Sequence, residues 1–190
     1  MAALTREEIV EKVQNGESFA GADLVNADLS YSNLKKGDFR KANLQNAHLQ
    51  NTNLEDADLR EANLEGAFLF GSNLSGAKLE GANLQKTNLQ DTNLEKTVLK
   101  GCDLSGLSLF GAQLDSANLE GANLSGAKLK RASLIDANLK NANLSGAHLQ
   151  RAHLRNANLS GANFSNANLK FADLTGAKTE GANFKGCVKE

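Results

Sequence analysis

The chain has 190 residues, which is enough for one domain with a core of its own. It has no Pro and no Trp, and 41% of its residues are hydrophobic, which excludes a disordered polar chain. Its 21 basic and 22 acidic residues leave a net charge of −1. This balance argues against a general nucleic-acid binder or a membrane-surface binder, because both need a basic excess. No apolar run is long enough for a transmembrane helix.

Residues 1–16 have the pattern of a short helix that packs on the structure that follows. Thr5 and Glu8 have the spacing of a capping box, and Asn15-Gly16 is a typical helix stop. An apolar stripe lies between them, formed by Ile9, Val10 and Val13. The pattern predicts a helix over residues 5–14, and a disordered start is the alternative. We also expect a cytoplasmic protein, because this segment lacks the apolar stretch of a secretory signal.

From residue 17 to 184 the sequence has one uninterrupted period of five residues. Every fifth residue from Phe19 to Phe184 is Leu or Phe, and only Thr179 breaks this rule. The residue two positions earlier is small, the residue between them is usually Asn or Asp, and the next two are polar or Gly. Representative centres are Leu24, Leu44, Leu64, Leu84, Leu104 and Leu124. We expect these centres to form a common core.

A period of five fits neither regular secondary structure. Successive Leu side chains would spread around every face of a helix, and they would alternate between the two faces of a straight strand. One geometry buries all of them, namely a short extended piece followed by a corner. The absence of Pro is consistent with this geometry, because each coil must donate backbone hydrogen bonds to its neighbours.

These tandem A-(N/D)-L-x-x units resemble the pentapeptide-repeat family. The resemblance implies an all-β solenoid, a right-handed four-sided β-helix with four units in each coil. Residues 17–184 would then form about 8.5 coils and a rod roughly 40 Å long. Residues 185–190 would be a tail that either covers the last coil or lies at an end-to-end homodimer contact, which the resemblance makes reasonable.

Five aromatic side chains fall on the outside of one side of such a coil. They are Tyr31, Phe68, Phe70, Phe110 and Phe171. Exposed apolar patches often mark interfaces, so this side is a candidate surface for binding another protein; an incidental cluster is the alternative. The same side becomes basic toward the C-terminus, with Lys128, Lys130, Arg131, Arg151 and Lys170. Aromatic and basic residues together can bind single-stranded nucleic acid, but the neutral overall charge argues against this.

No residues are arranged as a metal site, a cofactor site or a catalytic site. His148 and His153 would lie on adjacent sides of the coil and His48 five coils away, so we expect no metal site. Cys102 and Cys187 take the small inward position four coils apart, which is too far for a disulfide. A rod without inserted loops offers no concave pocket, so we expect neither an enzyme nor a bound cofactor.

The sequence therefore favours a rigid, non-enzymatic protein-interaction surface whose partner it does not identify. The resemblance allows a second function, a DNA mimic that binds DNA gyrase or another topoisomerase. A mimic needs a strongly acidic surface, whereas Glu55 and Asp56 share their side with Lys35 and Lys36. A structural spacer without a specific partner is the third alternative.

Overall fold

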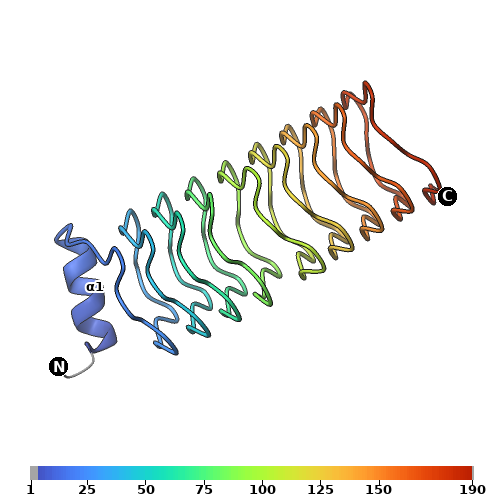
Figure 1. The fold of residues 1–190 in the computed structure, drawn as a ribbon. Coiled ribbons are helices and arrows are strands. Elements are labelled where there is room, and N and C mark those ends of the chain that lie inside the picture. The colour runs from blue at the N-terminus through green and yellow to red at the C-terminus, as the bar shows by residue number, and fades with distance from the viewer. Residues whose placement is uncertain (1–3, 190) are drawn as a thin grey trace.

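The computed structural model describes residues 4–189, which form a straight rod (Figure 1). One helix, α1 (Arg6–Gln14), lies across the N-terminal end of the rod. The rest of the described chain winds into a stack of similar coils, and the two termini lie at opposite ends. Within residues 4–189 no helix has the length and apolar character needed to cross a bilayer.

Each coil takes twenty residues and has four sides. Parallel bridges pair Asn43 with Asn63, His48 with Phe68, Asn53 with Asn73 and Asp58 with Lys78, one pair on each side. The same offset of twenty holds for every bridge in the described chain. A corner follows every unit, so each side contributes one bridged residue and is too short to count as a strand. The sheets are therefore built from isolated bridges stacked along the rod.

The corners are tight turns that require a positive φ. At one corner the Ala47 N–H donates to the Leu44 carbonyl at 3.0 Å, and Asn46 between them has a φ of 55°. This is the backbone conformation of the third residue of a type II turn, which Gly and Asn adopt most easily. It explains why the last position of the repeat is so often Gly or Asn.

The core is a single column of Leu side chains. Leu24, Leu44, Leu64, Leu84, Leu104 and Leu124 are all buried in it, together with the small residues beside them. Each buried Leu contributes about 1.5–3 kcal/mol before the loss of conformational entropy is subtracted. Asn side chains form columns on the outside, one of which contains Asn43, Asn63 and Asn83. For example, Asn63 Nδ2 donates to Asn43 Oδ1 at 3.1 Å, so amides as well as backbone groups join successive coils.

Between its first and last coils the stack is interrupted at one place, which we call the seam. Leu64 N–H donates to Asn83 O at 2.8 Å and Leu104 N–H to Asn123 O at 2.7 Å. The equivalent bond from Leu84 N–H to Asp103 O is missing from the described backbone hydrogen bonds. So are the inter-coil bonds expected from the N–H groups of Gly81, Lys86, Asp103 and Ser108.

The seam coincides with two departures from the repeat and with an Asp in a column that otherwise consists mainly of Asn. Cys102 and Leu107 are buried at inward positions where most units have Ala. Both side chains are larger than a methyl group, and excess volume in a packed core pushes the backbone apart. Asp103 has no side-chain N–H to donate to Asn83, so the Asn column is interrupted at the same point. The Gln85 amide instead donates to Asp103 Oδ2 at 2.9 Å across the seam.

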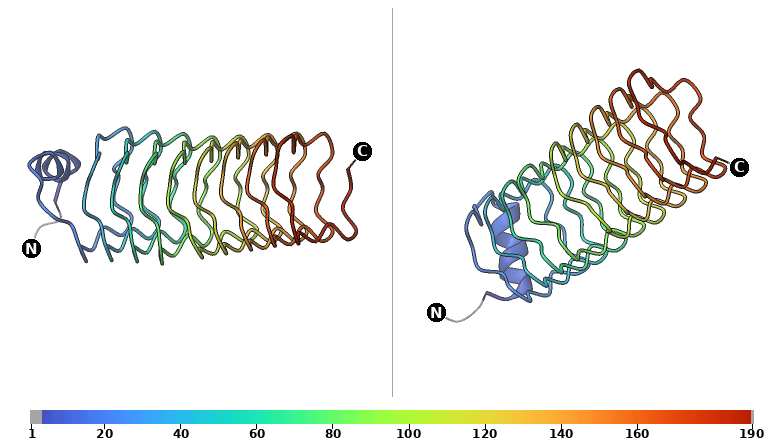
Figure 2. Two further views of the ribbon diagram at one scale, coloured as in Figure 1. Left: turned by 90° about the horizontal axis from the view of Figure 1, so that it is seen from above. Right: turned by 45° about the vertical axis from the view of Figure 1, so that its right-hand side comes forward.

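The two ends of the rod differ (Figure 2). At the first, the Thr5 hydroxyl accepts from Glu8 N–H at 3.2 Å, and the Glu8 carboxylate accepts from Thr5 N–H at 2.7 Å. Ile9 on α1 is buried in the same cluster as Phe19 of the first coil. At the other end, the last coil continues through Val188, which pairs with Asn168. Phe184 is only partly buried there, with Lys189 Nζ 4.9 Å from its ring centroid.

Candidate functional site

One side of the rod, called here the aromatic face, carries the predicted aromatic residues. Its core centres are Leu29, Leu49, Leu69, Leu89, Leu109, Leu129, Leu149 and Leu169. The residues just before and just after each centre point outward and form two columns along the rod. Consecutive bridges fix the first column as His48, Phe68, Asn88, Ser108, Lys128 and His148. Side chains about 4.8 Å apart therefore line this face from one coil to the next.

Three of the five aromatic residues form a central group. Phe68 and Phe70 flank Leu69 in one coil, and they are 43% and 41% exposed. The His48 and Phe68 rings pack edge to face, with ring centroids 5.2 Å apart. Phe110 is half-buried two coils further on, in the same column as Phe70. Phe68 and Phe70 thus expose apolar surface in the middle of the rod, and Gln90 separates them from Phe110.

The other two aromatic residues lie apart from this group. Tyr31 is 77% exposed beside α1, where it lines a hollow with Arg6 and Val10. Phe171 lies near the C-terminal end, with the Lys170 ammonium 5.2 Å and the Arg151 guanidinium 5.9 Å from its ring centroid. Such cation–π contacts hold the two cations in place. The sequence placed all five residues on one side but did not indicate that they fall into three groups.

A shallow hollow of about 540 Å³ adjoins Phe110 toward the C-terminus. Its lining consists of Gln90, Ser108, Phe110, Lys128, Lys130, His148 and Gln150. All of these residues belong to the aromatic face, and they come from four successive coils. The hollow combines an aromatic surface, two ammonium groups and several hydrogen-bonding groups, which is the usual mixture in a recognition site. The aromatic and basic residues were predictable from the sequence, but the depression between them was not.

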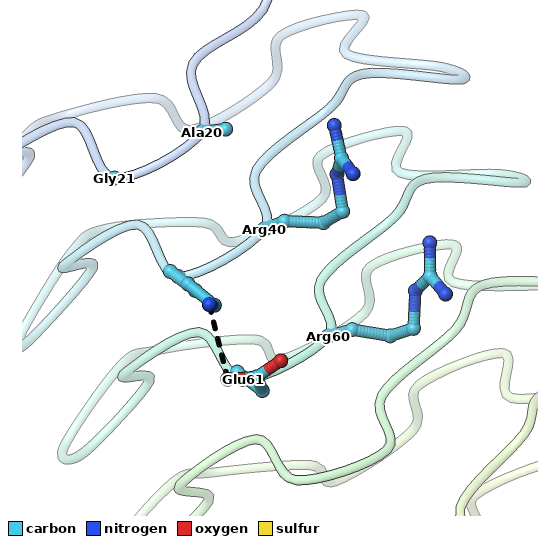
Figure 3. Close-up of a pocket in the computed structure, with 6 residues that line it drawn as sticks. Ala20, Gly21, Arg40, Arg60 and Glu61 are labelled. Atoms are coloured by element: carbon cyan, nitrogen blue, oxygen red, sulfur yellow. Dashed lines mark ion pairs between the residues drawn. The ribbon is translucent and has the colours of Figure 1, made fainter.

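A second hollow, of about 440 Å³, lies on a different side of the rod, between Arg40 and Arg60 (Figure 3). The two guanidinium groups extend in the same direction from successive coils. Each is already paired, because Arg40 Nε donates to Asp38 Oδ1 at 2.7 Å and Arg60 donates to Asp58. The neighbouring Lys41 and Glu61 also form an ion pair, at 3.6 Å. We interpret this side as a ladder of ion pairs that joins coils, because its charges satisfy one another.

The remaining polar candidates are dispersed. Within residues 4–189 no three His, Cys, Asp or Glu side chains are grouped closely enough to hold a metal ion. Both cysteines are free, and burial raises the pKa of the Cys102 thiol to about 11, so that it stays protonated at neutral pH. On the side proposed as a DNA mimic, Lys35 Nζ lies 2.8 Å from Glu55 Oε1 and neutralises it.

Comparison with known proteins gives a consistent result. The family model of pentapeptide repeats matches in 8 copies, in segments that together run from residue 16 to 188. HetL, a pentapeptide repeat protein involved in heterocyst differentiation regulation in the cyanobacterium Nostoc sp. strain PCC 7120, is 32% identical. That match covers 98% of each chain with a TM-score of 0.53.

Two further solved structures are similar over shorter parts of the chain. Rfr23, a pentapeptide repeat protein from the cyanobacterium Cyanothece 51142, is 28% identical over 75% of this chain and 91% of its own, with a TM-score of 0.27. A trypsin-treated form of QnrB1, a plasmid-mediated fluoroquinolone resistance protein, is 18% identical over 88% of this chain and 89% of its own, with a TM-score of 0.39. A search of curated proteins finds no significant match. The chain belongs to the pentapeptide-repeat family, and its fold is accordingly a right-handed four-sided β-helix.

Proposed function

We propose that the protein is a non-catalytic binding protein that presents the aromatic face to another protein. The observation that carries this proposal is the exposure of Phe68 and Phe70, together with half-buried Phe110, on one side of a stiff rod. Backbone bonds link almost every coil to the next, so little conformational entropy is lost when such a surface binds. HetL is involved in the regulation of heterocyst differentiation, which is compatible with action by binding.

The direct test is affinity capture from an extract of the source organism, with the wild-type chain and the Phe70→Ser/Phe110→Ser variant as baits. Both side chains point outward, so the variant should keep the circular dichroism spectrum and melting temperature of the wild type. We expect the specific partner to be lost from the variant. Val25→Ser is the matched control, because Val25 is 37% exposed on another side. Equal capture by all three baits would reject the aromatic face as the binding surface.

The DNA-mimic function receives less support. The net charge is −1, and acidic groups such as Glu55, Asp38 and Asp58 are paired with cations. A mimic of duplex DNA must present uncompensated negative charge to its partner. A supercoiling assay with purified gyrase distinguishes the two functions, since a mimic would inhibit gyrase at micromolar protein and a binder of unrelated proteins would not. A chain that captures no partner and leaves gyrase unaffected would instead be a structural spacer.

We also propose that two copies associate through their C-terminal ends. The last coil leaves Thr179 exposed and Leu174 and Phe184 only partly buried, around a hollow of about 430 Å³. Open solenoid ends with unpaired backbone groups favour association. Light scattering coupled to size-exclusion chromatography should give the mass of a dimer for the wild type and of a monomer for Leu174→Lys. A wild type that stays monomeric at high concentration would refute this contact.

A further inference from the structure

We propose that the hollow beside Phe110 is a docking site for an acidic segment of a partner protein. An aromatic or aliphatic residue of the segment would pack on Phe110, and carboxylates next to it would bind Lys128 and Lys130. This inference rests on the proposed function, because it assigns a partner chemistry to the C-terminal half of the aromatic face.

The first argument is that the cations of this half have no anionic partners. They are Lys128, Lys130, Arg131, Arg151 and Lys170, and all five are exposed. Within residues 4–189 none of them makes an ion pair. On other sides, by contrast, Lys35, Arg40, Lys86 and Lys100 each pair with a carboxylate. Lys36, Lys78, Lys96 and Lys140 also make no ion pair among the described residues, but they are divided between two other sides, whereas these five cations share one half of the aromatic face.

The second argument is the geometry of the cations. Lys128 and Lys130 flank Leu129 in one coil, so both side chains leave the rod on the same side and their Cα atoms are about 6.6 Å apart. His148 is bridged to Lys128 in the next coil and adds a ring N–H donor. Arg151 and Lys170 are held over the Phe171 ring further along the face. Together they form a positive border on the C-terminal side of the hollow.

The third argument is that the hollow has hydrogen-bonding groups suited to a peptide. The Gln150 side-chain oxygen is shielded from solvent and accepts no hydrogen bond from the described residues. Ser108 also lines the hollow, and its hydroxyl can both donate and accept a hydrogen bond. A peptide backbone offers an N–H for Gln150 and a carbonyl for the Ser108 hydroxyl. Because buried polar groups without partners are costly, a bound peptide would remove an existing penalty.

The same observations favour a protein over a nucleic acid. The basic residues are confined to one half of the face, whereas the other half carries Phe68 and Phe70 and the acidic side chains Asp28 and Asp91. A nucleic acid that continued along the face would meet these carboxylates with its phosphates. An acidic segment with an apolar residue instead matches an aromatic surface that lies next to a limited group of cations.

The test selects peptides of about twelve residues from a random display library on the full-length chain, and measures the affinity of the enriched peptides by fluorescence anisotropy. We expect Asp or Glu beside Phe, Trp or Leu. Lys128→Glu/Lys130→Glu should lower the affinity for these peptides at least about tenfold, and added salt should lower the affinity of the wild type as well. The matched control is Lys78→Glu/Lys140→Glu, which makes the same change of net charge on another side and should leave binding within about twofold.

Three results would overturn the inference: enriched peptides without acidic residues, equal loss in both charge variants, or tighter binding of an oligothymidine of similar length than of any peptide. Circular dichroism of both variants verifies that each is folded. The proposed function is tested separately by Phe70→Ser/Phe110→Ser. If that variant loses its partner while Lys128→Glu/Lys130→Glu keeps it, the aromatic face binds a protein but the acidic segment is excluded.

Discussion

The ring of Phe39 occupies the space that a methyl group on Gly37 would need. Most units have Ala at the position of Gly37 and Leu at the position of Phe39, so the larger and smaller residues compensate within one unit. Phe39 is fully buried and also stacks on Phe19, with ring centroids 5.8 Å apart. The ring therefore has little freedom to move away from an added methyl group.

We accordingly expect Gly37→Ala to lower the free energy of unfolding by about 1–3 kcal/mol, because it overpacks the first coils. Phe39→Leu alone should also destabilise the protein, since it leaves a cavity. The double variant Gly37→Ala/Phe39→Leu restores the Ala and Leu of most units. It should lower the free energy of unfolding by less than the sum of the two single changes. Urea unfolding measures all three, and strictly additive effects would contradict the packing relationship.

The seam predicts uneven hydrogen exchange. The amides of Gly81, Leu84, Lys86, Asp103 and Ser108 lack their inter-coil acceptors and should exchange roughly tenfold or more faster than the amides of Leu64 and Leu104. Exchange followed by NMR gives the rates residue by residue. A well-protected Leu84 amide in the wild type would show that the seam is closed in solution.

The cause assigned to the seam can be tested by exchanging sequences between coils. Cys102→Ala/Asp103→Asn restores the triplet found at residues 122–124, so it should slow exchange at Leu84 and raise the melting temperature. The reciprocal change, Ala122→Cys/Asn123→Asp, should open a similar seam one coil further on. If neither pair of substitutions moves the fast-exchanging amides, Leu107 is the remaining candidate for the cause.

The ion pair of Asp38 predicts a pH dependence. Hydrogen bonds from Arg40 (Nε at 2.7 Å), and to a smaller extent from Ser18, hold the pKa of the Asp38 carboxyl well below its usual range. A pKa that is lower in the folded state stabilises the protein above the unfolded value of about 3.9, and this contribution is lost as the pH falls through the lowered pKa. The pair is largely exposed, so we expect Asp38→Asn to lower the melting temperature by only about 2 °C at pH 7.

The difference in melting temperature between Asp38→Asn and the wild type should become smaller as the pH is lowered below about 4. Asp136→Asn is the control, because Asp136 is exposed and makes no ion pair among the described residues. Thermal melts from pH 7 to pH 2 measure both variants. A difference for Asp38→Asn that is the same at every pH would contradict the role of the carboxylate.

The contact between α1 and the first coil predicts local unfolding. Ile9→Asp places a charge where the side chain is 2% exposed, so α1 should detach and uncover the first coil. We expect greater binding of an apolar dye and faster exchange of the Phe19 and Leu24 amides, with the distant coils unchanged. Glu11→Asp, on the exposed side of α1, is the control and should behave as the wild type.

The fold was predictable because the five-residue period allows only one way to bury every Leu. The period does not specify four sides, which came from the family resemblance and which the offset of twenty now establishes. The seam was not predictable, although Cys102 and Leu107 were visible as exceptions, because its existence depends on how far two coils can separate. The division of the aromatic residues into three groups likewise depends on contacts that pair Phe171 with Lys170 and Arg151.

Because the bridge offset is always twenty residues, the number of residues between two positions determines both how far apart they lie along the rod and which sides they face. Removal of a single unit near residue 95 would leave every unit intact but turn the C-terminal half by a quarter revolution relative to the N-terminal half. Phe70 would then face one direction while Lys128 and Lys130 faced another. An insertion or deletion that keeps Phe70 on the same side as Lys128 and Lys130 must therefore contain a whole number of twenty-residue coils.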